Sequence, residues 1–170
     1  YHDTGGSSSL SSNVISSMIV DKKQRLWIGT RGGGLNLYNE ESNSFTHLTT
    51  KTINAQISND GVNTLFEDSQ GKIWIGTESG LNILSIKDEI WDVIQIQQKL
   101  GNKDSLSHNT FYSITETKEH EIWIGTNGGG ISVFDLNGKY KRTIKYELTK
   151  EDNYVNKYVN ALFKDNKLTR

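Results

Sequence analysis

Apolar and polar positions alternate over short stretches of this chain, with the two-residue period of β-strands. One such stretch is VISSMIVD, residues 14–21. LWIGT follows at residues 26–30 and is apolar on both faces, as expected of a strand in a sheet packed between two neighbours. A third strand is expected in LNLYN, residues 35–39, and a fourth begins near Phe45. The pattern predicts four strands joined by turns that contain Asp and Gly.

This four-strand pattern is repeated along the chain. The tetrapeptide WIGT occurs three times, with its Trp residues 47 and 49 positions apart. The alternating segment before it recurs at residues 61–68 and 110–117, and the fourth strand is again expected near an aromatic residue, Trp91 or Tyr140. Four strands in about 47 residues is the arithmetic of a β-propeller blade. Helical repeats of similar length need long segments with apolar residues at i, i+3, i+4 and i+7. The repeated segments of this chain do not have that spacing.

We therefore predict an all-β chain, a β-propeller fragment of about three four-stranded blades plus the first strand of a fourth. The predicted ranges are 1–57 for blade 1 with its lead-in loop, 58–106 for blade 2, 107–154 for blade 3 and 155–170 for the first strand of a truncated blade 4. By the repeat offset, the next Trp is expected at about position 171, so the repeat extends past Arg170. An open arc exposes apolar blade faces. We expect these faces to be covered by further blades of a parent chain or by self-association.

The residues that recur in every copy have a structural interpretation. A buried Trp suits the seam between blades, and the Gly two places on allows the neighbouring sheet to come close. These residues are Trp27, Gly29, Trp74, Gly76, Trp123 and Gly125. The glycine triplets at 32–34 and 128–130 connect strand to strand, which excludes a phosphate loop feeding a helix. Asp21, Asp68 and Asp165 occupy equivalent turn positions, where an Asx turn is expected.

Positions that differ between the copies are the candidates for ligand binding. Arg31, Glu78 and Asn127 follow the three WIGT segments directly. In a propeller, that loop and the loop entering the first strand open on the same rim. The entering loops contribute three further candidates, Asp60, His108 and Asn109. A rim with these side chains could hydrogen-bond a neutral polyhydroxylated ligand, and it could equally be ordinary solvated loop.

Composition narrows the possible functions. The 19 basic and 20 acidic residues nearly cancel, so nothing draws the chain strongly to nucleic acid or an anionic membrane. There is no Cys, which excludes disulfides and thiolate chemistry, and no Pro. The four histidines are too scattered for a ligand cluster, and we interpret them as solvated loop residues. We predict no cofactor, no metal and no catalytic residue in this segment.

Each copy resembles the two-component regulator propeller repeat, which consists of a strand, an Asp turn, (L/I)WIGT, a glycine turn and Leu-Asn. The lead-ins SSLSSNVI, residues 8–15, and SLSHNTF, residues 105–111, support this resemblance. The third copy departs from it, with Thr117 in place of Asp and Ile131-Ser132 in place of Leu-Asn. The resemblance implies the periplasmic sensor region of a hybrid two-component system from gut Bacteroidetes. Such proteins carry two seven-bladed propellers, a small β-sandwich, a membrane helix, a histidine kinase and a response-regulator output.

Three functions remain open at this point. The leading hypothesis, from the resemblance, is a non-catalytic segment that helps to detect a glycan-derived oligosaccharide and signals to transcription through phosphorelay. The second is a protein-interaction propeller without a small ligand. The third is a propeller lyase or hydrolase, which would need a His and a carboxylate together on the rim, for example His2 and His108 beside an acid.

Overall fold

The chain folds into three antiparallel four-stranded sheets, as a computed structural model describes them for residues 8–98, 106, 108–145 and 159–162. The first sheet contains β1 (Ile15–Val20), β2 (Leu26–Thr30), β3 (Gly34–Asn39) and β4 (Ser44–Leu48). The second contains β5 (Val62–Glu67), β6 (Ile73–Thr77), β7 (Gly80–Lys87) and β8 (Ile90–Ile96). The third contains β9 (Phe111–Glu116), β10 (Ile122–Thr126), β11 (Ile131–Phe134) and β12 (Tyr140–Ile144). The all-β prediction is confirmed, and the described residues include no helix.

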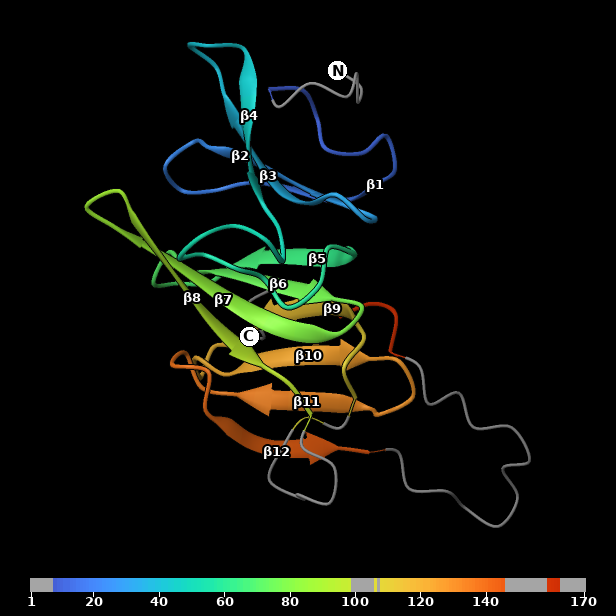
Figure 1. Ribbon diagram of the computed structural model, residues 1–170. Helices are drawn as coiled ribbons and strands as arrows, with labels where there is room; N and C mark the ends of the chain where they lie inside the picture. The colour runs from blue at the N-terminus through green and yellow to red at the C-terminus, as the bar shows by residue number, and fades with distance from the viewer. Residues whose placement is uncertain (1–7, 99–105, 107, 146–158, 163–170) are drawn as a thin grey trace.

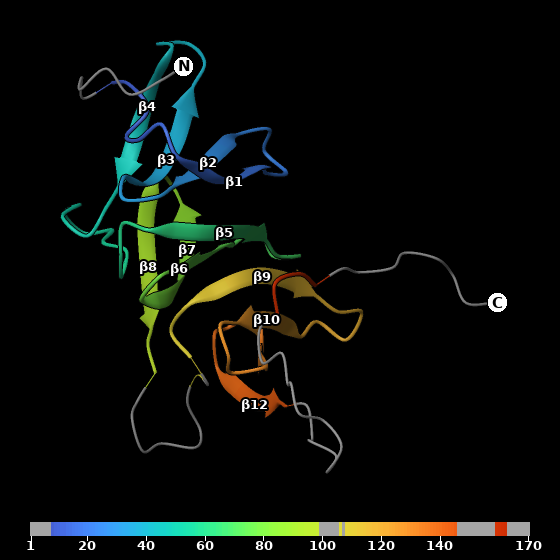
Figure 2. The ribbon, with the colours of Figure 1, turned by 90° about the vertical axis from the view of Figure 1, so that its right-hand side faces the viewer.

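The sheets are stacked in chain order, each with its strands in sequence order (Figures 1 and 2). The inner strands β1, β5 and β9 contact one another in succession. The outer strands β4, β8 and β12 close the far edge of each sheet. Each sheet is therefore a propeller blade, and the chain forms an arc of three blades.

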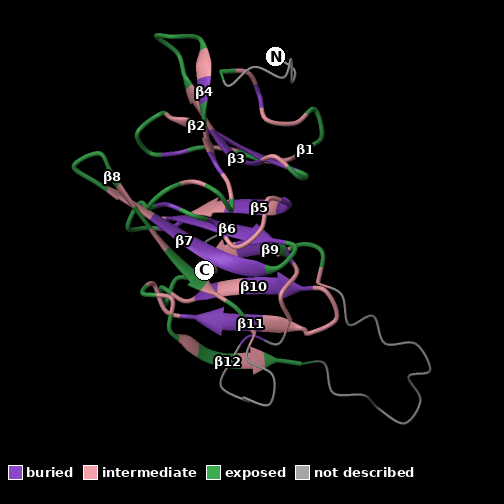
Figure 3. Cartoon of the chain, in the orientation of Figure 1, coloured by how far each residue is buried: buried purple, intermediate pink, exposed green. Residues whose placement is uncertain are grey.

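Apolar seams between consecutive blades form the core (Figure 3). Trp27 is fully buried between blades 1 and 2, with its ring centroid 5.6 Å from that of Trp91. Trp74 is fully buried between blades 2 and 3, with its ring 6.3 Å from that of Phe134. The glycines also lie at these seams, because a Cβ added to Gly29 would come within 2.6 Å of Cγ1 of Val62 in the next blade.

The outer faces of the arc have no partner sheet among the described residues. Met18 of β1 is 59% exposed, whereas Leu65 at the equivalent position of β5 is 6% exposed. Trp123 is half-buried, unlike its two counterparts. The arc thus ends on blade 1 with Ile15, Met18 and Val20 of β1 exposed, and on blade 3 with the half-buried Trp123.

The turn aspartates have a second role that the sequence analysis missed. Oδ1 of Asp68 accepts the backbone N–H groups of Gln70 and Lys72, both at 2.9 Å, which is the expected Asx turn. Its Oδ2 accepts the indole N–H of Trp74 at 2.8 Å, so the turn orients the seam residue. Asp21 and Trp27 make the same bond at 2.9 Å. Burial raises the pKa of Asp21, but hydrogen bonds from Trp27 and Arg25 outweigh this and hold the pKa below its usual value.

Blade 3 replaces this aspartate without losing the turn. Oγ1 of Thr117 accepts the backbone N–H groups of Glu119 and Glu121, both at 3.3 Å. The carboxylate of Glu121 accepts the indole N–H of Trp123 at 3.2 Å. Glu121, two residues before Trp123, therefore accepts the indole hydrogen bond that Thr117 cannot accept in place of the usual Asp.

The predicted blade 4 falls mostly outside the described residues. Of its range, residues 159–162 are described and are not assigned to a strand. The N–H of Val159 donates to the carbonyl of Thr126 at 3.2 Å. A Cβ on Gly125 would meet Val159, as one on Gly29 would meet Val62. Val159 thus contacts blade 3 at the position that blade 2 uses against blade 1.

Candidate functional site on the rim

The lead-in loops are fixed to their blades by a buried amide. Oδ1 of Asn36 accepts the N–H of Ser11 at 3.1 Å, and Oδ1 of Asn82 accepts the N–H of Ser58 at 2.8 Å. Both asparagines are fully buried in the third strand of their blade. The Asn of the Leu-Asn pair therefore positions the loop that carries the candidate residues.

The turns after WIGT are held on the same rim by backbone hydrogen bonds. The N–H of Glu78 donates to the carbonyl of Gly61 at 2.9 Å, and that of Asn127 donates to Thr110 at 3.0 Å. Arg31 donates in the same way to Val14 at 2.9 Å. Each variable residue thus lies beside the lead-in loop of its own blade.

The glycine turns also bond to the lead-in loop of the next blade. The N–H groups of Gly32 and Gly34 donate to the carbonyl of Asp60 at 3.0 and 2.8 Å. The N–H of Gly80 donates to the carbonyl of Asn109 at 2.9 Å. The six candidate residues consequently form one continuous band along the rim of the three blades.

Within this band, three of the six side chains already serve the loop structure. The carboxylate of Asp60 accepts the N–H of Thr50 at 2.7 Å, and Oδ1 of Asn109 accepts the N–H of Gln98 at 2.6 Å. Nδ1 of His108 accepts the N–H of Thr110 at 3.1 Å. These bonds fix the loops and leave fewer polar groups for a ligand.

The other three candidates present their side chains outward. Arg31 and Glu78 are exposed and Asn127 is half-buried. Among the described residues, none of the three side chains has a hydrogen-bond or ion-pair partner. The rim therefore offers a guanidinium, a carboxylate and a carboxamide on consecutive blades.

On the opposite rim, the blades are joined by a carboxylate that the sequence analysis did not single out. Oε2 of Glu116 accepts the N–H of Ser69 in blade 2 at 2.7 Å, and its Oε1 lies 2.7 Å from Nδ1 of His120. Burial raises the pKa of Glu116, but the hydrogen bonds from His120 and Ser69 outweigh it and keep the pKa below its usual value. Between blades 1 and 2, the N–H of Lys22 donates to Oε2 of Glu67 at 2.9 Å. In the sequence, this contact is marked by a Glu directly before the turn in the second and third copies, Glu67 and Glu116.

Two histidines differ from their expected role as solvated loop residues. His47 lies within β4, and its Nε2 is 2.7 Å from the carbonyl oxygen of Ser9. His120 is in the expected turn but contacts Glu116 of its own blade and Ser69 of its neighbour, whose Oγ lies 3.4 Å away. The contact between His120 and Ser69 of the neighbouring blade could not be predicted from the residue spacing within one repeat. His2, proposed as a partner for His108, lies outside the described residues.

We expect the Glu116 contact to make stability pH-dependent. A carboxylate whose pKa is lowered on folding stabilises the folded state above its unfolded pKa, about 4.3, and loses this contribution as the pH falls. The melting temperature should decrease between pH 6 and pH 3, and it should decrease less in Glu116→Gln. Glu119→Gln, which changes an exposed carboxylate in the same turn, is the control. Equal pH dependence in wild type and Glu116→Gln would contradict this assignment.

Two kinds of functional feature are absent from the described part of the chain. No three His, Asp or Glu side chains there are grouped so that they could hold a metal ion. No helix there has the length and apolarity needed to span a bilayer.

Stacked four-stranded sheets with Trp-lined seams define the class of this chain, which is that of β-propeller blades. Three segments, residues 9–32, 56–79 and 105–128, match the family described as two component regulator propeller. The chain therefore carries two-component regulator propeller repeats, as its motifs indicated. Each matched segment runs from a lead-in loop to the turn after WIGT, and together they contain all six candidate rim residues.

Solved structures with the same fold come from larger proteins. The extracellular domain of BT3049 from B. thetaiotaomicron, a proposed hybrid two-component system, is 25% identical, with a TM-score of 0.68 over 91% of this chain. The extracellular domain of BT4673 from the same organism is 20% identical, with a TM-score of 0.63 over 94% of this chain. PorZ, a surface component of the type-IX secretion system of Porphyromonas gingivalis, is 16% identical, with a TM-score of 0.63 over 98% of this chain.

This chain spans a minor part of each of these structures. It covers 19% of the BT3049 domain, 19% of the BT4673 domain and 26% of PorZ. No curated protein matches the sequence.

Proposed function

We propose that this chain is a non-catalytic segment of the extracellular or periplasmic sensor region of a hybrid two-component system. Its main support is the set of three two-component regulator propeller repeats, together with the 25% identity to the BT3049 extracellular domain. The parent protein would be a histidine kinase that relays the signal to transcription by phosphorelay. The remaining blades of the parent chain would cover the open faces of the arc.

The ligand in this proposal is a glycan-derived oligosaccharide bound on the rim. Arg31, Glu78 and Asn127 supply donors and acceptors from three successive blades, which suits an extended ligand with many hydroxyl groups. The ligand would act by binding one arrangement of the sensor region more tightly than another, because only differential affinity shifts such an equilibrium. No step of this mechanism requires a catalytic group.

Calorimetric titration of the complete extracellular region that contains this chain tests the proposal. The probes are xylo-, manno-, gluco- and arabino-oligosaccharides of three to six units, together with oligogalacturonates as charged counterparts. We expect saturable binding of at least one probe, and Arg31→Ala or Asn127→Ala should weaken it several-fold through the loss of hydrogen bonds. Absence of binding to every probe would favour the alternative function, a propeller that serves only protein contacts.

A further inference from the structure

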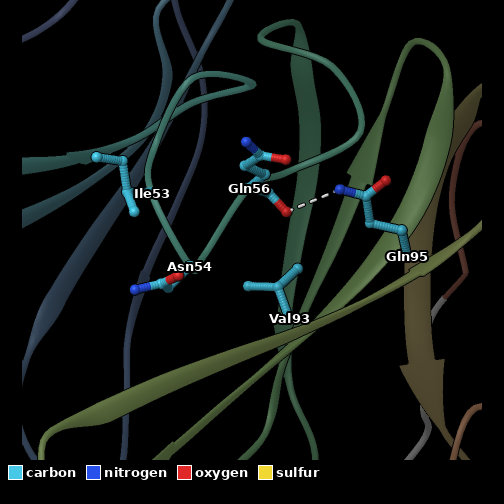
Figure 4. Close-up of a pocket in the computed structure, with 5 residues that line it drawn as sticks. All are labelled: Ile53, Asn54, Gln56, Val93 and Gln95. Atoms are coloured by element: carbon cyan, nitrogen blue, oxygen red, sulfur yellow. Dashed lines mark hydrogen bonds between the residues drawn. The ribbon is translucent and has the colours of Figure 1, made fainter.

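An open polar hollow lies beside the seam between blades 1 and 2, next to the outer strand β8. It has a volume of about 580 Å³ and is lined by Ile53, Asn54, Gln56, Val93 and Gln95 (Figure 4). The first three belong to the segment that connects β4 to β5, and the last two to the outer strand β8. The hollow is therefore built from the connection between two blades and the edge of the second blade.

The connecting segment is held firmly in place. Ala55 and Ile57 are 5% and 1% exposed in the seam core, which directs Asn54 and Gln56 to the surface on either side of Ala55. The N–H of Ile57 donates to the carbonyl of Thr49 at 3.3 Å. Nε2 of Gln95 donates to the backbone carbonyl of Gln56 at 2.9 Å, which ties β8 to the segment (Figure 4). The backbone that carries these side chains is thus fixed before any ligand arrives.

The chemistry of the hollow is that of neutral carboxamides. In the described part of the chain, the side-chain amides of Asn54 and Gln56 have no hydrogen-bond partner, so each offers N–H donors and an acceptor oxygen. Gln95 uses Nε2 internally and keeps its Oε1 as an acceptor. Val93 and the 83% exposed Ile53 add apolar surface. None of the five lining residues is charged, so the hollow does not favour an ion.

From these observations we infer that the hollow is a subsite for a neutral sugar residue. Closely spaced donors and acceptors beside aliphatic carbon match the hydroxyl groups and C–H faces of a pyranose or furanose ring. A ligand here would touch the blade 1 to blade 2 connection and β8 at once. This inference rests on the proposed function and adds a second contact region to the rim.

The test uses the complete extracellular region and the neutral oligosaccharides named above. Gln56→Ala removes one carboxamide, and Asn54→Gly removes another while keeping a residue that tolerates the φ of 66° at this position. Each variant should bind the best probe roughly two- to tenfold more weakly, which is the effect of losing one or two hydrogen bonds. The matched control is Gln70→Ala, because Gln70 is an exposed carboxamide on the opposite rim and does not line the hollow. It should bind as the wild type does, and all variants should keep the wild-type melting temperature within a few degrees.

Each possible result has a distinct meaning. Binding that is lost in Arg31→Ala but unchanged in the Gln56 and Asn54 variants would overturn the subsite and leave the proposed function standing. Binding of a short unstructured peptide that is weakened by the same two variants, with no sugar bound, would overturn the sugar assignment. Absence of binding to any sugar or peptide would overturn both the subsite and the oligosaccharide ligand.

Discussion

Replacement of Trp74 by alanine should lower the free energy of unfolding by about 3–5 kcal/mol. The indole is fully buried between blades 2 and 3, and its removal leaves a cavity in a seam that is lined by residues such as Ile122 and Phe134. It also removes the N–H that Oδ2 of Asp68 accepts within the core. Urea denaturation followed by far-ultraviolet circular dichroism would measure the loss independently of tryptophan fluorescence.

Two further variants separate the contributions at this position. Trp123→Ala in the same 170-residue chain is the matched control, since there this indole is half-buried at the equivalent position of blade 3, and it should cost roughly 1–2 kcal/mol. Trp74→Phe keeps most of the apolar surface and loses the bond to Asp68, so its cost should fall between the two. Equal losses in Trp74→Ala and Trp123→Ala would show that the seam does not dominate stability.

The second large effect is expected from Gly76→Ala, at about 2–3 kcal/mol. An added Cβ would lie 2.6 Å from Cγ2 of Thr64 and 2.9 Å from Cβ of Phe111, the latter in the next blade. Both distances are too short for a carbon–carbon contact, so the neighbouring strand must shift. The same denaturation experiment measures this loss.

A double-mutant cycle shows whether the clash is the cause. Thr64→Ala removes Cγ2 and should recover part of the stability that Gly76→Ala loses. Gly32→Ala provides a comparison, because no atom lies within 4 Å of its added Cβ and only its φ of +86° is unfavourable, at a cost of about 1–2 kcal/mol. Strictly additive effects of Gly76→Ala and Thr64→Ala would contradict the steric explanation.

Much of the fold could be predicted because each strand carries its own local signal. The alternating segments, the WIGT strands and the aromatic starts of the fourth strands coincide with strands of the structure, for example Trp91 in β8 and Tyr140 in β12. The link between Asp and Trp was missed, although both intact copies place the two residues six positions apart. A constant spacing between a carboxylate and an indole was the signal that could have revealed it.

The candidate site was harder to predict for a physical reason. Sequence variation marked loops that lie together on one rim. It could not show that the side chains of Asp60 and Asn109 bond within the loop structure, because their partners lie outside the repeated motif. The hollow beside β8 depends on the connection between β4 and β5, of which residues 49–55 lie outside the matched repeat segments. Contacts across a seam, such as Ser69 with Glu116, depend on how two copies pack and not on either copy alone.

Backbone N–H groups on both rims of blades 1 and 2 donate to the following blade, whereas the N–H groups of Leu65 and Val159 donate back to the preceding blade. On one rim the N–H groups of Gly34 and Gly80 donate to carbonyls of the following blade, and on the other Lys22 and Ser69 donate to its glutamates. The two ends of the arc therefore present different groups, so neither end is complementary to itself. A two-fold dimer through like ends would not reproduce these contacts. Added blades must instead join head to tail, which is a heterologous contact that closes into a ring or continues as a filament.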